Sequence, residues 1–203
     1  MTNLDDAKKL FYEKKYLEAR EIFLKENDLY SSGLCSLLLK DEKSALRYWS
    51  KDKKTSPASQ WGLCVLRFIH LSITKKPTFF QTRAFLEVYL NLFLENNLIE
   101  WAQNLVSFCD KLYYSNPETY KFIARALFAN GYFDLAINFC KKSIKLIYCD
   151  PEAFLIMAQC QYLLNDIAEA LDSTNRTLAM VPDYYPAKLF RKILKENIEK
   201  KYS

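Results

Sequence analysis

Apolar residues recur at the spacing of an α-helix over most of the chain. A clear example lies between positions 120 and 127, where the apolar residues are Tyr120, Ile123, Ala124 and Leu127. Residues three and four positions apart lie on one stripe of a helix, so this segment predicts a helix with one buried face. Gly131 follows soon afterwards, and glycine readily takes the positive φ at which many helices end. The segment therefore predicts a helix and then a turn.

Several residues repeat at a fixed interval of 34 positions. The small residues at this interval are Ala102, Ala136 and Ala170, and also Ala124 and Ala158. Other residues repeat in the pairs Pro117 and Pro151, Tyr120 and Phe154, and Ile123 and Met157. A small side chain where two helices cross lets their backbones approach closely, and larger neighbours fill the gaps beside it. We therefore predict stacked helical hairpins in which these alanines are buried.

Two related triplets predict where helices begin. They are Asn-Pro-Glu at 116–118 and Asp-Pro-Glu at 150–152. Each has the order of an N-cap residue, a proline at the first helical position, and an acid that suits the positive end of the helix dipole.

Over roughly residues 83–184 the chain resembles the tetratricopeptide repeat family. The third unit of this stretch matches the family pattern through Phe154, Met157, Ala158, Ala170 and Pro182. The second matches through Tyr120, Ile123, Ala124, Leu127, Gly131 and Ala136, with Cys140 and Ser143 in place of the usual aromatic residue and alanine. The first, about 83–116, matches more weakly through Leu86, Tyr89, Phe93, Ala102 and Cys109.

The resemblance implies an all-α fold. The expected architecture is a right-handed α-α superhelix of about five to six helix pairs with a C-terminal capping helix. We expect a single domain over 1–203. Within it, 1–78 would hold irregular short repeats, 79–184 three regular repeats, and 185–203 the capping helix.

The N-terminal part repeats less regularly. The motif at 16–23 is similar to the motif at 44–49, but their alanines, Ala19 and Ala45, lie only 26 residues apart. Gly33 and Gly62 are followed by similar residues, and both are predicted to take the small position of a first helix. A helix at 57–73 has no obvious second-helix partner in this frame. A departure from regular stacking is therefore expected near 74–78, with Pro77 marking the break.

The last segment predicts one amphipathic helix from Pro186 to about Lys201. Its apolar residues are Leu189, Phe190, Ile193, Leu194 and Ile198, and its basic residues are Lys188, Arg191, Lys192, Lys195, Lys200 and Lys201. A terminal helix with a polar outer face is what a repeat array needs at its end. The alternative is a basic helix that docks on a membrane or on an acidic partner.

Composition supports long helices. Half of the chain is hydrophobic, and only three glycines and six prolines interrupt it, which is too few turn residues for a β-sandwich or a doubly wound sheet. The six cysteines are Cys35, Cys64, Cys109, Cys140, Cys149 and Cys160, and no two have CxxC spacing. They are interpreted as buried, reduced thiols rather than as zinc ligands or disulfides.

The sequence offers no catalytic motif. His70 is the single histidine, so a histidine-based triad or zinc protease site cannot be assembled, and we expect a structural role for it. The three scattered glycines form no phosphate-binding loop. No enzyme activity, metal or cofactor is expected.

Net charge and targeting signals narrow the class of protein further. The net charge is +5, but it is concentrated near 40–54 and 188–203, and the aromatic residues follow core spacing, so nucleic-acid binding is only a remote alternative. The first residues lack a basic segment followed by an apolar run, so no secretory signal is expected there. The longest apolar stretches are too short and too polar to span a membrane. A cytoplasmic protein is expected.

The family resemblance places partners in a concave groove lined by first helices. The positions that generally point into it correspond here to Val88, Asn91, Lys121, Phe122, Arg125, Phe128, Leu155, Ile156, Gln159 and Tyr162. This predicts an apolar and aromatic groove with a basic spot at Lys121 and Arg125, which lie one helical turn apart.

The same resemblance argues against one kind of partner. Family members that hold the C-terminal carboxylate of heat-shock chaperones use lysines, asparagines and an arginine. The matching positions here are Glu87, Asn91, Phe122, Glu152 and Ile156, of which one fits. We therefore expect a protein or peptide partner with apolar anchors, bound by an adaptor or chaperone-like module. The alternative is a scaffold subunit that assembles with itself into a homo-oligomer.

Overall fold

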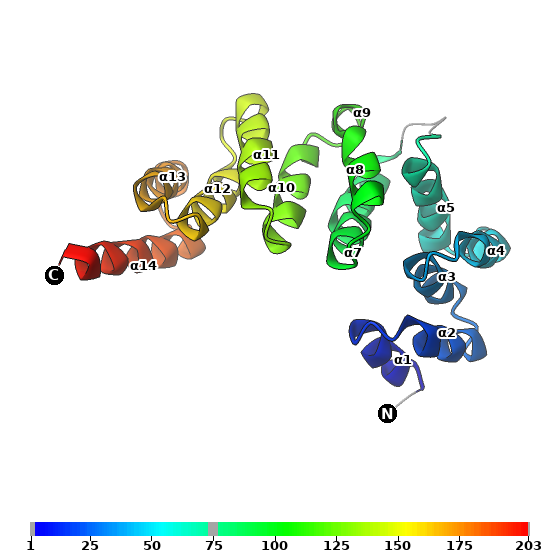
Figure 1. Ribbon diagram of the computed structural model, residues 1–203. Coiled ribbons are helices and arrows are strands. Elements are labelled where there is room, and N and C mark those ends of the chain that lie inside the picture. The colour runs from blue at the N-terminus through cyan, green and yellow to red at the C-terminus, as the bar shows by residue number, and fades with distance from the viewer. Residues whose placement is uncertain (1–2, 73–76, 203) are drawn as a thin grey trace. The chain divides into compact units, whose positions relative to one another are not determined.

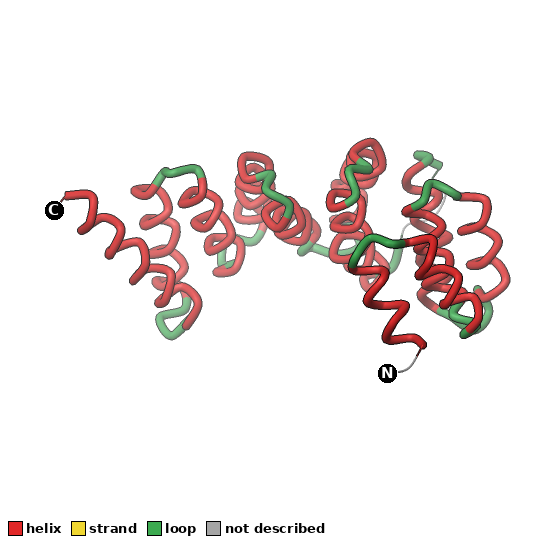
Figure 2. Tube along the Cα trace, turned by 60° about the horizontal axis from the view of Figure 1, so that its bottom comes forward, coloured by secondary structure: helices red, strands yellow, loops and turns green. Residues whose placement is uncertain are grey.

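The computed structural model describes residues 3–72 and 77–202, apart from the side chains of 200–202. Within this part of the chain every regular element is helical, and short loops join the helices (Figure 2). The all-α fold class predicted from the apolar spacing is confirmed. The expected departure from regular stacking near 74–78 falls largely on residues 74–76, which lie outside the described residues.

The chain forms two compact units. Unit 1 comprises Met1–Pro77 and Asn96–Ser107, and unit 2 comprises Thr78–Glu95 and Phe108–Ser203.

Unit 1 is built from helices that pack in chain order. Its elements are α1 (Asn3–Tyr12), α2 (Tyr16–Lys25), α3 (Leu29–Leu38), α4 (Glu42–Asp52), α5 (Pro57–Ile69) and α8 (Ile99–Ser107). Successive helices from α1 to α5 contact one another, α5 also reaches back to α3, and α8 packs on α5. The helix predicted near 57–73 therefore has partners on both sides, one of them from about 30 residues further along the chain.

Trp49 fills the centre of unit 1. It is fully buried, and its indole lies between the glycines of two first helices, Gly33 on α3 and Gly62 on α5. A Cβ at Gly33 would lie 2.3 Å from its Nε1, and a Cβ at Gly62 would lie 2.6 Å from its Cδ2. The prediction that both glycines occupy the small position of a helix is confirmed, because a larger residue would collide with the ring.

Unit 2 continues the pattern of helical hairpins. Its elements are α6 (Phe79–Ala84), the π-helical turn η1 (Phe85–Tyr89), α7 (Leu90–Glu95), α9 (Cys109–Tyr113), α10 (Thr119–Ala129), α11 (Phe133–Leu146), α12 (Pro151–Leu163), α13 (Ile167–Met180) and α14 (Tyr185–Tyr202). From α10 to α14 each helix packs on the next, and α10 and α12 also touch each other (Figure 1). The first helices of neighbouring hairpins thus lie side by side.

The repeated small residues are buried as predicted. Ala124, Ala136, Ala158 and Ala170 have no exposed surface, and Ala102, in unit 1, is 3% exposed. A small residue therefore stands at each of these packed positions, which is the reason for the 34-residue period seen in the sequence.

The observed start of the helix agrees with the prediction at the 150–152 triplet and differs from it at the 116–118 triplet. The Asp150 carboxylate accepts hydrogen bonds from the backbone N–H groups of Glu152 and Ala153, and Pro151 is the first residue of α12, as predicted. The prediction for Pro117 is wrong, because α10 begins two residues later, at Thr119. Asn116 still binds the Glu118 backbone N–H, but within a turn that precedes the helix.

Several helices end at a residue with positive φ. Gly131 does so at φ 82°, as the sequence predicted. Elsewhere the position is held by residues that carry a Cβ, namely Lys14, Asn27, Lys40, Leu71, Asn97 and Asn165. This explains how the chain forms many tight turns with only three glycines.

The cysteines are free thiols in the part of the chain that the structure describes. Four of them are buried as predicted, namely Cys35, Cys109, Cys140 and Cys160. Burial raises the pKa of Cys35 and of Cys160 to about 12, so both stay protonated and unreactive at neutral pH. The prediction of burial is wrong for Cys149, which is exposed, and only half correct for Cys64.

The C-terminal helix α14 covers the last hairpin. Leu155 on α12, Leu178 on α13 and Ala187 on α14 form a buried cluster with Tyr184 and Phe190 packed against it. Leu194 on the same helix is fully buried. The predicted helix is present over Tyr185–Tyr202, whereas two apolar residues of its predicted stripe, Leu189 and Ile193, are 49% and 39% exposed. Its role as a cap stays a prediction.

Candidate functional site

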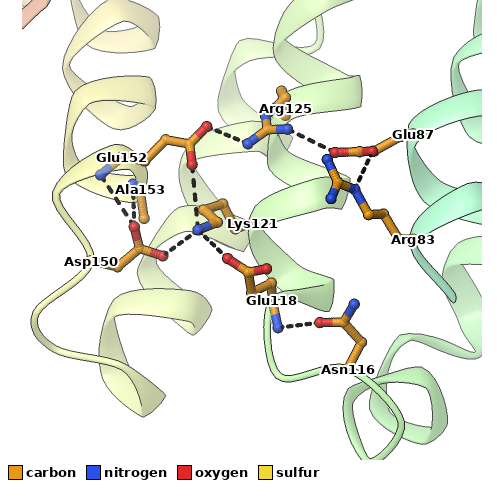
Figure 3. A network of polar contacts seen from close by, with 9 residues as sticks. All are labelled: Arg83, Glu87, Asn116, Glu118, Lys121, Arg125, Asp150, Glu152 and Ala153. Carbon is orange, nitrogen blue, oxygen red and sulfur yellow. Dashed lines mark hydrogen bonds and ion pairs between the residues drawn. The ribbon is translucent and has the colours of Figure 1, made fainter. Parts of the chain in front are cut away.

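Polar side chains from three neighbouring first-helix segments meet in unit 2 (Figure 3). The central element is α10, which contacts α7 and η1 on one side and α12 on the other. From α10, Lys121 and Arg125 project one turn apart on the same face, and both contact acidic residues of the neighbouring segments. This network is the main polar feature on the first-helix side of the unit.

Lys121 is enclosed by carboxylates. Its Nζ lies 2.7 Å from Glu118 Oε1, 3.2 Å from Asp150 Oδ2 and 3.4 Å from Glu152 Oε2. Only 8% of its side chain is exposed. Burial by itself would lower the pKa of Lys121, but the three carboxylates outweigh it and raise the pKa above its ordinary value. Lys121 is therefore a charged ammonium that joins the start of α12 to α10.

Arg125 links two helices on either side of it. Its Nη1 lies 2.9 Å from Glu87 Oε1, and its Nη2 forms an ion pair with Glu152. Glu87 also accepts a hydrogen bond from Arg83 Nε at 2.6 Å. The guanidiniums of Arg83 and Arg125 lie 5.8 and 5.6 Å from the centre of the Phe122 ring, within the range of cation–π attraction.

Glu87 reaches this network from the π-helical turn η1. A π-helical turn is wider than an α-helical turn, because each hydrogen bond spans one more residue. Such turns are rare and recur at functional sites. Here the turn carries Glu87 and its exposed neighbour Val88 on the first-helix side of the unit.

The ten residues predicted to line a groove all lie on the first-helix segments η1, α7, α10 and α12 of unit 2, and they differ in exposure. The buried ones are Lys121, Phe122, Leu155 and Ile156, the half-buried ones are Asn91, Arg125, Phe128, Gln159 and Tyr162, and the exposed one is Val88. Leu155 belongs to the buried cluster under α14, and the ring of Tyr162 packs edge-on against Phe190 of α14. These two side chains therefore pack against the C-terminal helix.

The predicted basic spot is wrong in its charge. Lys121 and Arg125 do lie on one face, but four carboxylates compensate them, from Glu87, Glu118, Asp150 and Glu152. Two of these, Glu87 and Glu152, come from the segments on either side of α10. The face thus carries mixed charge.

Part of this network could have been found from the sequence. Glu118 with Lys121 and Arg83 with Glu87 are spaced by three and four residues, the spacing of ion pairs along a helix. The pairs between helices, such as Arg125 with Glu87, join residues 38 positions apart and depend on how the hairpins stack. No local sequence signal identifies them.

The single histidine lies outside the ion-pair network. His70 Nε2 lies 2.5 Å from Glu42 Oε2 at the surface of unit 1, so the histidine has a polar partner there. No group of three or more His, Cys, Asp or Glu side chains within 3–72 and 77–202 is arranged to hold a metal ion. No helix in the same residues is both long enough and apolar enough to cross a membrane.

Similarity to known proteins is found among solved structures, and it is weak. No protein-family model matches the chain, and no curated protein matches it. Among solved structures it is similar to the C-terminal part of a TPR repeat-containing protein from Cytophaga hutchinsonii. The TM-score is 0.49 and the identity 18%, with 98% of this chain and 72% of that chain covered. These values are too low to assign a family.

Proposed function

We propose that the chain is a non-enzymatic, tetratricopeptide-like module that binds a segment of a partner protein on the first-helix side of unit 2. The binding surface would be the accessible part of the predicted groove, which we call the unit 2 face. It consists of Val88, Asn91, Arg125, Phe128 and Gln159.

The ion-pair network carries this proposal. Through Arg125 it ties η1 to α12, and through Lys121 it ties α10 to the first turn of α12. Three first-helix segments are thereby held side by side before any partner arrives. A surface that is already ordered loses less conformational entropy on binding, which favours affinity.

The chemistry of the unit 2 face suits a partner segment that carries both polar and apolar residues, with the apolar ones as anchors. Val88 is apolar and 41% exposed, and Phe128 is half-buried. Gln159 offers an amide that can bind the backbone of a partner. Because Arg125 already binds two carboxylates, we expect apolar contacts rather than an acidic tail to provide most of the affinity.

Site-specific photo-crosslinking tests the proposal. A photoreactive phenylalanine analogue is introduced at Val88 and, as a matched control, at Leu135 of α11, which is also an exposed apolar position in unit 2. We expect a defined crosslinked product from position 88 and none from position 135, and the substitution Phe128→Asp should weaken that product. Equal crosslinking at both positions, or none at 88, would contradict the proposed face.

The same experiment distinguishes the alternative function, a scaffold that assembles with itself. A crosslinked product of twice the chain mass from position 88, together with a stable dimer in light scattering, would favour self-assembly. A monomer that crosslinks to a different protein would favour the adaptor.

A further inference from the structure

A second surface lies in unit 1 and shares no residue with the unit 2 face. Between α4 and α5 the structure has a depression of about 460 Å³ that is open to solvent. Its apolar part consists of Leu46, Leu63 and Leu66, and three cations, Lys43, Lys53 and Arg67, also line it. We call it the α4/α5 groove.

The apolar part of the groove includes one side chain that the fold does not bury. Helix α4 packs on its neighbours through Ala45 and Trp49, both fully buried. Leu46 lies beside that face and is 51% exposed, whereas Leu66 at the opposite side of the groove is 8% exposed. An isolated exposed leucine is common on protein surfaces, but this one borders a depression lined by two further leucines.

In the described part of the chain, the cations around the groove have no carboxylate partner. Lys43, Lys53 and Arg67 are exposed, and none of them forms an ion pair with a carboxylate within residues 3–72 or 77–202. One carboxylate, from Glu42, lines the groove, and it is bound to His70. The groove therefore combines an apolar floor with an excess of positive charge.

We propose that the α4/α5 groove binds an acidic amphipathic helix of a partner protein, with aliphatic side chains entering the groove and carboxylates facing Lys43, Lys53 and Arg67. Charge complementarity selects acidic residues at the rim, and the leucine floor selects an apolar stripe. Among the described residues no Phe, Tyr or Trp side chain lines the groove, and its one imidazole, from His70, is bound to Glu42, so the groove favours an aliphatic stripe over stacked nucleic-acid bases.

A designed peptide provides the probe. It has about 18 residues, long enough to be helical, with leucines on one stripe, glutamates on both flanks and a fluorescent label. Three comparison probes are a peptide of the same composition with the leucines scattered around the helix, a peptide with lysine in place of glutamate, and a single-stranded oligonucleotide. Binding to the full chain is measured by fluorescence anisotropy.

Substitutions assign the binding to the groove. Lys53→Gln with Lys43→Gln removes two rim charges, and Leu46→Asp places a charge on the floor. The matched controls are Lys51→Gln with Lys25→Gln and Leu17→Asp, because Lys51, Lys25 and Leu17 are exposed in unit 1 outside the groove. Circular dichroism melts identify any variant that has lost its fold.

We expect the designed peptide to bind more tightly than all three comparison probes and more weakly at high ionic strength. The rim double substitution should weaken binding roughly tenfold, as the loss of two partly exposed ion pairs predicts, and Leu46→Asp should weaken it at least as much. The control variants should bind like the wild type. Equal binding by the scattered peptide, tighter binding by the oligonucleotide, or equal loss in groove and control variants would each overturn the proposal.

Discussion

Trp49 and Gly33 are in direct contact, and the contact leaves no space for a methyl group. A Cβ added at Gly33 would lie 2.3 Å from the indole Nε1 and 2.7 Å from Cδ1. The indole is held in place, because its N–H donates a hydrogen bond to the carbonyl of Tyr30 at 3.1 Å. The ring therefore fixes how closely α3 and α4 approach each other.

We expect Gly33→Ala to destabilise the protein, although alanine favours helices by about 1 kcal/mol over glycine. The clash with Trp49 should outweigh that gain and lower the free energy of unfolding by about 1–3 kcal/mol. Chemical denaturation of Gly33→Ala, Trp49→Phe and the double variant measures the coupling. In the smaller Phe background Gly33→Ala should cost much less, and equal costs in both backgrounds would show that the indole is not responsible.

A second prediction compares the two cations of the ion-pair network. Lys121 is almost fully buried among carboxylates, so Lys121→Met leaves buried negative charge uncompensated and should lower the free energy of unfolding by about 2–4 kcal/mol. Arg125 is 39% exposed, and Arg125→Met should cost about 1 kcal/mol or less. Urea titrations at neutral pH provide both values, and equal costs would contradict the difference in burial.

The Lys121 contribution also has a defined pH dependence. Because its pKa is raised in the folded state, the stabilisation is fully present below the ordinary pKa of 10.5 and is lost as pH rises through the folded-state pKa. The difference between wild type and Lys121→Met should therefore remain constant near neutrality and decrease only in strong alkali.

The hydrogen bond between Tyr120 and Asp110 should have the opposite pH dependence, because its contribution to stability is lost in acid. The Tyr120 hydroxyl donates a hydrogen bond of 2.7 Å to the Asp110 carboxylate and lowers the pKa of Asp110 below its ordinary value of 3.8, with a smaller effect from the Cys109 thiol. This stabilisation is present above pH 3.8 and is lost as pH falls through the folded-state pKa. Since Asp110 is exposed, Tyr120→Phe should cost only about 0.5–1 kcal/mol at pH 7, and the part due to the Asp110 charge should vanish in acid.

The last prediction concerns α14. Leu194 is fully buried, and Leu189, five residues earlier on the same helix, is 49% exposed. If the helix closes the end of unit 2, Leu194→Ala should lower the free energy of unfolding by about 2–4 kcal/mol, while Leu189→Ala should change it by less than about 0.5 kcal/mol. Thermal and urea unfolding of both variants test this, and a negligible effect of Leu194→Ala would mean that α14 is not a structural cap.

The sequence was most informative where one residue type meets a local need. Ala136 at a helix crossing, Asp150 at a helix start and Gly131 at a helix end were all identified from spacing and from the conformations that these residues prefer. Pro117 stands in a triplet of the same kind as Pro151, but it is not the first residue of a helix. The turn formed by Asn116 and Glu118 precedes α10, and nothing in the triplet itself distinguishes that turn from a helix start.

The candidate site was less accessible to sequence reasoning. Lys121 and Arg125 were placed on the correct face, but their charge was misjudged because the compensating Glu87 and Glu152 come from other hairpins. Phe122 was expected to face a partner, and it is 3% exposed, between two guanidiniums. Contacts of this kind depend on the angle and offset at which hairpins stack, which a one-dimensional pattern does not contain.

The π-helical turn η1 has a consequence for how this protein can change in length. Its wider hydrogen bonds accommodate one residue more than an ordinary helical turn would hold. Deleting one residue within Phe85–Tyr89 would convert it to regular helix, and the α-helical residues on either side would keep nearly the faces that they now present, because the wide turn is what absorbs the extra residue. The change would be confined to the turn itself, from which Glu87 reaches Arg125. This turn is therefore a place where the chain can lose one residue without changing the register of the helical segments that flank it.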